Sequence, residues 1–395
     1  MKVILIVFIT IFSFNSFAQF EIGFNKEEAR DMVAICNSFT FLELYHSDLE
    51  ILPAGYKKTY TSGMFGMDNK YQVYQKGNVG IINLRGSTAK KISWLENINS
   101  AMIPAKGVIK VSGENFDYCF AQDTNAAVHA GYALGIAFLA KDILYQIRIM
   151  NIEGINNFII TGHSQGGALA SLLRAYLENL PADQMSKGNK FKNYSFAAPM
   201  IGNKWFSREY NSKFCDANTS FNVAIKSDPI PSFPLSYNDT ASFFKDNLKA
   251  FLFDKEAFSL KKSISEGSVL FFEESLKRTV KKFGTSVSEQ ISKDVGPVIL
   301  PDYVADINYL KLNNLIEINP VDFPKVLKDP SVVKNDSLVS VYKRGADGHF
   351  LNDELYVKES WNYQHKPYNY YVSILKTYFP EEYKALKNKY LAENL

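Results

Sequence analysis

Apolar residues recur at helical spacing in two long stretches of the chain. The first covers residues 27–50, and the second runs from Ala130 to Met150. In the second, the apolar positions lie mostly three or four residues apart: Leu134, Phe138, Leu139, Ile143, Leu144 and Ile147. Both patterns predict a helix with an apolar face, and Gly154 marks the end of the second.

Short runs rich in β-branched and aromatic residues lie around these stretches. Such runs predict strands, here two within 70–84 and one each at Gly107–Val111, Asn157–Thr161, Tyr194–Ala197 and Phe221–Ile225. Strands that alternate with helices predict an α/β fold, with a mostly parallel central sheet flanked by helices.

The alternation stops between residues 235 and 340. Apolar residues there form two helical stripes: Phe244, Leu248 and Phe251, then Leu276, Val280 and Phe283. We therefore expect a largely helical insertion at about 235–340. It either packs its apolar face on the main domain, or it covers a functional site or contacts a lipid surface.

The N-terminus predicts export. Lys2 precedes an apolar run from Val3 to Phe12, and Ser16 and Ala18 are small residues of the kind that a signal peptidase reads. Residues 1–18 are interpreted as a signal peptide, which leaves 19–395 as one periplasmic or extracellular domain. A retained anchor is the alternative, although the run is too short to span a bilayer comfortably. No later segment resembles a membrane span.

Composition narrows the class of protein. The 395 residues are 46% hydrophobic, enough for a large core, and 44 basic against 41 acidic residues give a net charge of +3 without a long basic run. Charge therefore does not support nucleic-acid binding. Of Cys36, Cys119 and Cys215, two could pair in an exported protein, and their spacing does not suit a metal. We expect neither a metal nor a cofactor.

The stretch Ile159–Leu173 reads IITGHSQGGALASLL and predicts a strand, a sharp turn and a helix, with Ser164 at the turn. In such a nucleophile elbow the turn exposes the serine hydroxyl, and bulk at Gly162 or Gly166 would clash with neighbouring elements. The Gln165 N–H at the helix start is then free to face an oxyanion. The alternative is a glycine-rich turn with an incidental serine.

A serine nucleophile needs a histidine base, and the chain has five histidines. His163 adjoins the serine at the strand end, where we expect a structural role. In a hydrolase sheet the chain order is serine, acid, histidine. That order excludes His46 and His129, which precede the serine, and favours His365, just before the C-terminal helix, with His349 as the alternative.

The acid should follow a later strand. Asp228 comes directly after the strand Phe221–Ile225, in a loop stiffened by two prolines. Asp347 and Asp216 are weaker rivals. A second oxyanion donor should follow an earlier strand, where Gly86 allows a close approach and Ser87 offers an N–H and a hydroxyl beside the Gln165 N–H.

Five separated blocks resemble class 3 (fungal-type) lipases. They are Asn83–Ser87 with Trp94, Val128–Tyr132, Thr161–Ala170, Ser195–Pro199 with Gly202 and Asn203, and Ser227–Pro231. The resemblance covers about Val79–Pro234 and resumes near His365. It implies an α/β-hydrolase fold, carboxylic ester hydrolysis, a triad of Ser164, Asp228 and His365, and an oxyanion hole at Ser87 and Gln165.

The chain departs from the family in two places. Gln165 stands where a leucine is common, which makes the pocket more polar, and 365 − 228 = 137 positions separate the acid from the histidine. The family's lid would fall near Thr88–Ala101, which is either a movable flap or a fixed surface helix.

The sequence therefore predicts a secreted serine hydrolase that cleaves lipid esters, acylglycerols or phospholipids, through an acyl-enzyme. The expected partners are the ester substrate and, transiently, a lipid interface. The alternatives are an esterase for small soluble esters, an acyltransferase with the same triad, and a hydrolase-fold binding protein without turnover.

Overall fold

The computed structural model describes residues 20–44, 51–88, 90–234, 269–334, 342–392 and 395. The predicted signal peptide, His46 and the first apolar stripe of the insertion lie outside these residues. They stay predictions. Among the described residues, no helix is long and apolar enough to cross a membrane.

A seven-stranded sheet forms the centre of the molecule, in the order β1-β2-β3-β8-β9-β10-β12. The first two pairings are antiparallel, and the strands from β3 onwards run parallel. The strands are β1 (Lys57–Thr61), β2 (Tyr71–Lys76), β3 (Val79–Leu84), β8 (Asn157–His163), β9 (Lys190–Phe196), β10 (Ser220–Ile225) and β12 (Leu315–Ile318). The predicted mostly parallel sheet is confirmed.

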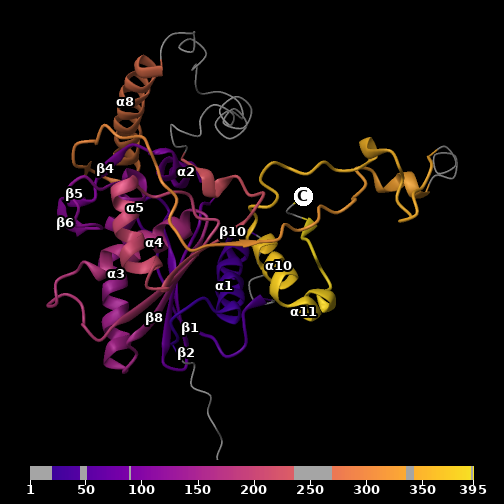
Figure 1. Cartoon of the computed structure of the whole chain (residues 1–395), viewed down its shortest axis with the longest axis horizontal. Coiled ribbons are helices and arrows are strands. Elements are labelled where there is room, and N and C mark those ends of the chain that lie inside the picture. Colours follow the sequence, from indigo (N-terminus) through magenta and orange to yellow (C-terminus); the bar gives the residue numbers. More distant parts are fainter. Residues whose placement is uncertain (1–19, 45–50, 89, 235–268, 335–341, 393–394) are drawn as a thin grey trace, which may run out of the picture.

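Helices cover both faces of this sheet (Figure 1). One face carries α3 (Ala130–Ile152) and α4 (Gln165–Glu178), and the other carries α1 (Lys26–Leu44) and α10 (Pro367–Tyr378). The short helices α5 (Lys204–Tyr210) and α11 (Pro380–Ala385) complete the two layers.

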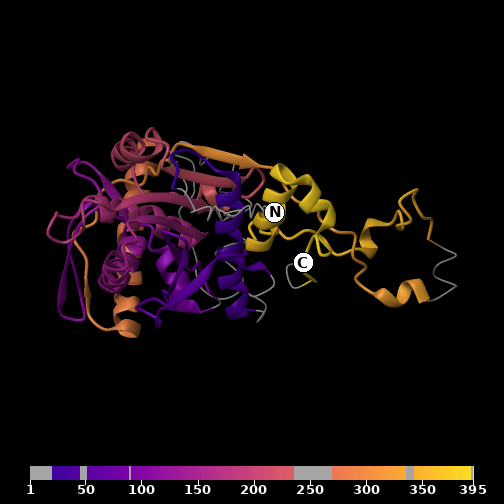
Figure 2. The same ribbon diagram turned by 90° about the horizontal axis from the view of Figure 1, so that it is seen from below.

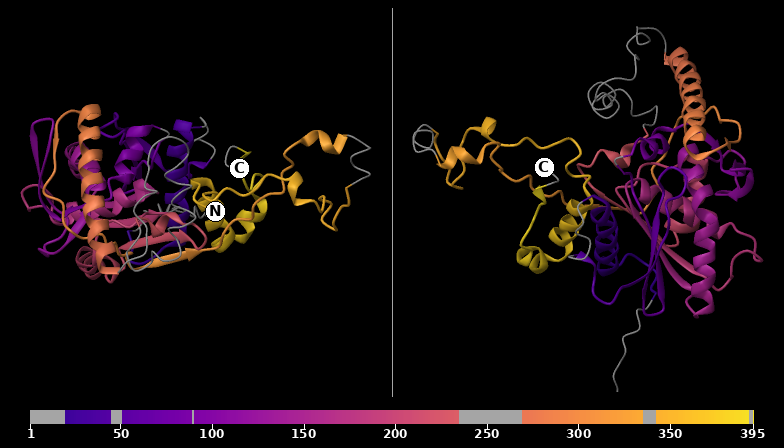
Figure 3. Two further views of the ribbon diagram at one scale, coloured as in Figure 1. Left: turned by 90° about the horizontal axis from the view of Figure 1, so that it is seen from above. Right: turned by 180° about the vertical axis from the view of Figure 1, so that it is seen from behind.

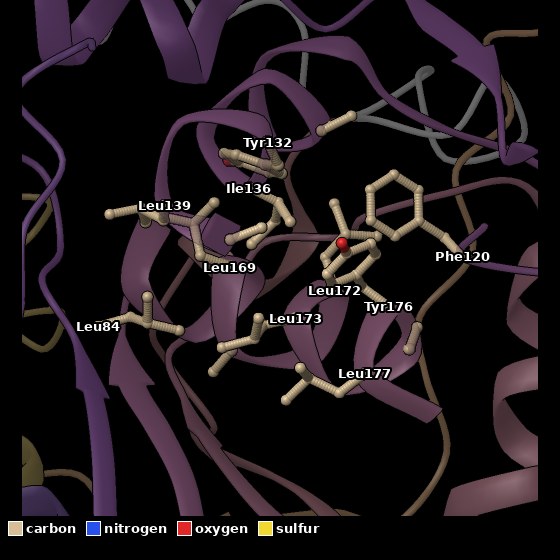
Figure 4. Close-up of a cluster of buried hydrophobic side chains, with 14 of the residues drawn as sticks. Leu84, Phe120, Tyr132, Ile136, Leu139, Leu169, Leu172, Leu173, Tyr176 and Leu177 are labelled. Atoms are coloured by element: carbon tan, nitrogen blue, oxygen red, sulfur yellow. The ribbon is translucent and has the colours of Figure 1, made fainter. Parts of the chain in front are cut away.

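Alternation along the strands separates two apolar cores. In β3, Ile82 and Leu84 join the core under α3 and α4, whereas Val79 and Ile81 join the core under α1 and α10. Successive side chains of a strand point to opposite faces, so a strand buried on both faces is apolar throughout. Figure 4 shows the first core, where leucines of α4 pack against Tyr132, Ile136 and Leu139 of α3.

Two small antiparallel sheets flank the main one. The predicted strand at Gly107–Val111 corresponds to β5 (Lys106–Val111), which pairs with β6 (Glu114–Cys119) and β11 (Val298–Ile299) rather than with the central strands. β4 (Met102–Pro104) pairs with β7 (Ala127–His129), directly before α3.

The described part of the predicted insertion begins with one long helix, α8 (Val269–Val295). Val287 and Ile291 bury its C-terminal half against the body, beside α2 (Lys91–Ile98), while its N-terminal half projects (Figure 1). The chain then forms β12, which adds a parallel strand beside β10. The sequence analysis did not predict β12.

Residues 319–334 and 342–362 lie on an arm that leaves the sheet edge after β12 and returns just before α10 (Figures 2 and 3). A bridge between Leu327 and Tyr356 joins its outgoing and returning segments. Beyond that bridge, Val332 and Phe350 form a small apolar cluster with Tyr356. The arm therefore has its own minor core, separate from the two main ones.

Candidate active site

Ser164 lies in a strained turn between β8 and α4, with φ of 59°. Glycine is required around it: a Cβ on Gly162 would lie 2.2 Å from the Gly166 oxygen, and one on Gly166 would lie 2.2 Å from the Leu84 oxygen. The crowding predicted for an elbow is present, and left-handed backbone at a non-glycine residue marks a constrained position.

His365 connects Ser164 to Asp228. Its Nε2 lies 2.8 Å from Ser164 Oγ, and its Nδ1 lies 2.9 Å from Asp228 Oδ2. With the proton on Nδ1, the ring donates to Asp228 and accepts from the serine hydroxyl, which is the tautomer a general base needs. Residues far apart in the chain thus meet at the ends of parallel strands.

Asp228 is a buried carboxylate with several donors. Besides His365, the hydroxyl of Tyr370 donates to Oδ2 over 2.6 Å and the N–H of Ile230 donates to Oδ1 over 3.0 Å. Burial alone would raise the pKa of Asp228, but His365 and these donors lower it below its usual value. Asp228 is therefore held ionised beside the histidine.

Tyr370 is a site residue that the sequence analysis missed. It is fully buried on α10, five positions after His365, and its oxygen also accepts the Ile225 N–H at 3.1 Å. It thus ties the acid to the end of β10. The only sequence signal was an aromatic residue in the helix that follows the histidine.

The other candidate residues lie elsewhere. His349 is exposed on the arm, with its ring near Tyr356. Asp347 pairs with Lys325, and Asp216 is exposed after the helical turn that follows α5. None of these three contacts His365 or Ser164 through an interaction within the described chain.

Two buried histidines have structural contacts. His129 caps α3 by accepting the Tyr132 N–H, and burial lowers its pKa to about 3. The ring of His163 lies 4.9 Å from that of His365 and 5.2 Å from that of Tyr370, between centroids. Burial holds the pKa of His163 well below its usual value, so it stays neutral beside His365.

Ser87 and Gln165 are adjacent, as predicted. The Ser87 hydroxyl donates to Gln165 Oε1 over 2.8 Å, and Asn97 Nδ2 donates to Ser87 Oγ over 2.7 Å. Gly86 permits this approach, since a Cβ there would lie 2.7 Å from the His163 oxygen. Neither backbone N–H of the pair donates to another described residue, which leaves both able to face an oxyanion.

Polar contacts tie α2, within the predicted lid segment, to the body. The hydroxyl of Tyr132 donates to Asn97 Oδ1 over 3.2 Å, and His129 Nε2 lies 3.1 Å from the backbone carbonyl oxygen of Asn97. Ser93 and Glu96 are buried on the same helix. These contacts attach α2 to α3, and the movable flap and the fixed surface helix both stay predictions.

Nearby charges and cysteines are accounted for. Lys90 lies 2.7 Å from Asp68, and the buried Arg85 also pairs with that carboxylate. Cys36, Cys119 and Cys215 are all free. Within the described ranges, no cluster of three or more histidine, cysteine or acidic side chains could hold a metal.

Comparisons with known proteins agree with one another. Residues 81–238 match the family described as Lipase (class 3). The chain is 25% identical over 139 residues to "Secreted mono- and diacylglycerol lipase 1" of Fusarium solani, a match that covers 34% of this chain and 39% of that protein. The chain thus spans about two fifths of that curated relative.

Solved lipase structures are more distant. Lipase II from Rhizopus niveus is 17% identical, with a TM-score of 0.39 over 54% of this chain and 77% of that one. A triacylglycerol lipase from Penicillium expansum is 16% identical, with a TM-score of 0.37 over 53% and 74%.

Proposed function

We propose that this chain belongs to the class 3 lipase family, whose model matches residues 81–238, and that it is a serine hydrolase that cleaves carboxylic esters of lipids. The observation that carries the proposal is the contact of His365 with both Ser164 and Asp228. A histidine that bridges a strained, glycine-flanked serine and a buried carboxylate has the arrangement that activates a hydroxyl.

The reaction follows from these contacts. His365 takes the Ser164 proton as Oγ attacks the ester carbonyl, while Asp228 stabilises the imidazolium that forms. The N–H groups of Ser87 and Gln165, together with the Ser87 hydroxyl, stabilise the oxyanion. His365 then protonates the leaving alcohol, and water repeats the sequence on the acyl-enzyme to release the acid.

Neutral acylglycerols are the proposed substrates. The Fusarium relative is named for mono- and diacylglycerols, and the family match covers the segment that holds Ser87, Ser164 and Asp228. Lys90, within the predicted lid segment, is paired with Asp68. That pairing favours uncharged head groups over phospholipids. The secreted relative and the predicted signal peptide support export.

A fluorophosphonate probe tests the chemistry directly. We expect stoichiometric labelling of Ser164, no labelling of Ser164→Ala, and hydrolysis of p-nitrophenyl esters by the unmodified protein alone. A chain-length series of esters, together with mono- and diacylglycerols, separates lipase from soluble-ester esterase. An added alcohol tests for acyl transfer. Absence of labelling on the folded protein would favour a binding protein without turnover.

A further inference from the structure

A largely buried polar cluster, in which Ser87 and Asn97 are half-buried, connects the elbow to α2 and takes no part in the triad. We call it the Gln165 cluster, and it consists of Ser87, Ser93, Glu96, Asn97 and Gln165. The side chain of Gln165 is 1% exposed and Glu96 is 0% exposed. Buried polar groups that no step of the proposed reaction uses need a reason, because burying them costs free energy.

The Gln165 side-chain oxygen is the hub of this cluster. Ser87 Oγ donates to it over 2.8 Å, Ser93 Oγ over 3.3 Å and Asn97 Nδ2 over 3.4 Å. A leucine at this position would supply the same backbone N–H but no acceptor. The three contacts therefore depend on the glutamine itself.

The Ser87 hydroxyl is held from two directions. Its oxygen accepts from Asn97 Nδ2 at 2.7 Å, and its proton is directed at Gln165 Oε1. When the hydroxyl turns toward an oxyanion, Ser93 and Asn97 remain as donors to Gln165 Oε1. The buried oxygen is then not left unsatisfied, which keeps the cost of that rotation small.

Glu96 supports the cluster from α2. Its carboxyl group lies beside the side chains of Gln165 and Asn69, although neither oxygen meets a well-aligned partner within the described residues. Two glycines of α3 make room for it: a Cβ on Gly131 would lie 2.0 Å from the Glu96 backbone oxygen, and one on Gly135 would lie 2.3 Å from Oε1. A smaller side chain at position 96 would leave Gln165 without lateral support.

We propose that Gln165 acts through its side chain as a positioning residue, which fixes the Ser87 hydroxyl for the oxyanion hole, and that Glu96 holds Gln165 in place. This inference rests on the proposed function, since it assigns roles within the same reaction. It gives the glutamine of the elbow two tasks: its N–H contacts the oxyanion, and its amide oxygen holds the Ser87 side chain in place until the hydroxyl turns toward the oxyanion.

A double-mutant cycle between positions 87 and 165 tests the proposal. The variants are Ser87→Ala, Gln165→Leu and the double variant, assayed on a soluble p-nitrophenyl ester. Removal of one oxyanion donor typically costs about 100-fold in kcat, and we expect that for Ser87→Ala. We expect a loss of about tenfold for Gln165→Leu with KM unchanged, and no further loss when it is added to Ser87→Ala. Gln165→Met repeats the cycle if the leucine variant does not fold.

Two replacements of Glu96 show whether it supports Gln165 through its polar side chain or only fills space. Glu96→Leu should lower kcat about as much as Gln165→Leu, and Glu96→Gln, which keeps the shape, should restore it to within about threefold. Two results would overturn this inference alone. One is a loss of kcat in the double variant that equals the product of the two single losses; the other is a kcat of Gln165→Leu within twofold of that of the unmodified protein. An unmodified protein that neither hydrolyses esters nor reacts at Ser164 would overturn the proposed function, and this inference with it.

Discussion

Two buried carboxyl groups lie near the nucleophile elbow, and their pKa values are shifted in opposite directions. Burial by itself raises the pKa of both Asp228 and Glu96. Asp228 receives donors from His365, Tyr370 and a backbone N–H, and its pKa falls below the usual value, whereas the pKa of Glu96 rises to about 8. The difference teaches that donors, rather than depth, decide which buried acid carries charge in this protein. Asp228 of the triad is therefore charged at neutral pH, whereas Glu96 on α2 is mostly uncharged.

The largest effect should follow from removing the partner of the charged acid. His365→Ala takes away the base and the ring that bridges Ser164 and Asp228, so kcat should fall by about 10³-fold or more. Steady-state hydrolysis of a soluble ester measures it. His349→Ala, on the exposed arm, is the matched control and should stay within twofold. Loss of turnover only in His349→Ala would mean that His349, on the arm, is the base. The contrast between Asp228 and Glu96 would then no longer concern the catalytic site.

Neutralising the other acid should change stability with pH. The pKa of Glu96 is about 8 in the fold and near 4.5 when unfolded, so the stability of the unmodified protein decreases as pH rises through this window. Glu96→Gln does not titrate, and it should gain on the order of 3 kcal/mol relative to the unmodified protein between pH 5 and pH 8.

Urea unfolding at both pH values measures the free energy of unfolding. The control is Glu317→Gln, because Glu317 is exposed on β12. A gain that is equal at pH 5 and pH 8 would show that Glu96 is already ionised in the fold, and the contrast with Asp228 would disappear.

Removing one donor from Asp228 should have a smaller effect. Tyr370→Phe deletes the 2.6 Å bond to Oδ2 and the acceptor of the Ile225 N–H. Because that donor lowers the pKa of Asp228, its loss should raise the pKa and move the acid limb of the pH profile of kcat/KM upward. We expect kcat to fall about fivefold, which corresponds to about 1 kcal/mol, the size of one average hydrogen bond.

The pH profile distinguishes this effect from loose packing. Tyr368→Phe on the same helix removes the hydroxyl that contacts the Asn388 carbonyl. It should leave the acid limb where it is. An identical shift in both variants would mean that Tyr370 acts through the packing of α10 rather than through Asp228.

The sequence predicted the parts of the site that local pattern and chain order determine. The elbow is readable because a run of β-branched residues ends at Gly162 and small residues follow Ser164. The strand Phe221–Ile225 placed Asp228, and chain order favoured His365 over His349. These residues now lie in contact, while their catalytic roles stay predictions.

The remainder depends on packing between distant segments. Tyr370 reaches Asp228 only because α10 packs beside β10, and Glu96 is buried only because Gly131 and Gly135 bring α2 close to α3. β12 is only four residues long, and it is a strand because it pairs with β10. Neither periodicity nor motif spacing carries such information.

The smallest effect should come from the arm, although His365 follows it in the chain. The loop of His365 is held at the base of the arm, away from the segment beyond the Leu327–Tyr356 bridge: Gln364 Oε1 accepts the Val321 N–H at 3.1 Å, and Gln364 Nε2 donates to the Val321 oxygen over 3.0 Å. A short Gly-Ser linker in place of residues 329–354 keeps these bonds and the bridge between Leu327 and Tyr356. We expect kcat/KM on a soluble ester within twofold of the unmodified protein, because surface segments tolerate such changes.

The same variant assayed on emulsified acylglycerol tests for lipid contact: a selective loss of activity on the emulsion assigns the arm to the lipid interface. A tenfold loss of kcat/KM on the soluble ester, with the fold intact, would instead show that the arm supports the triad of Ser164, Asp228 and His365.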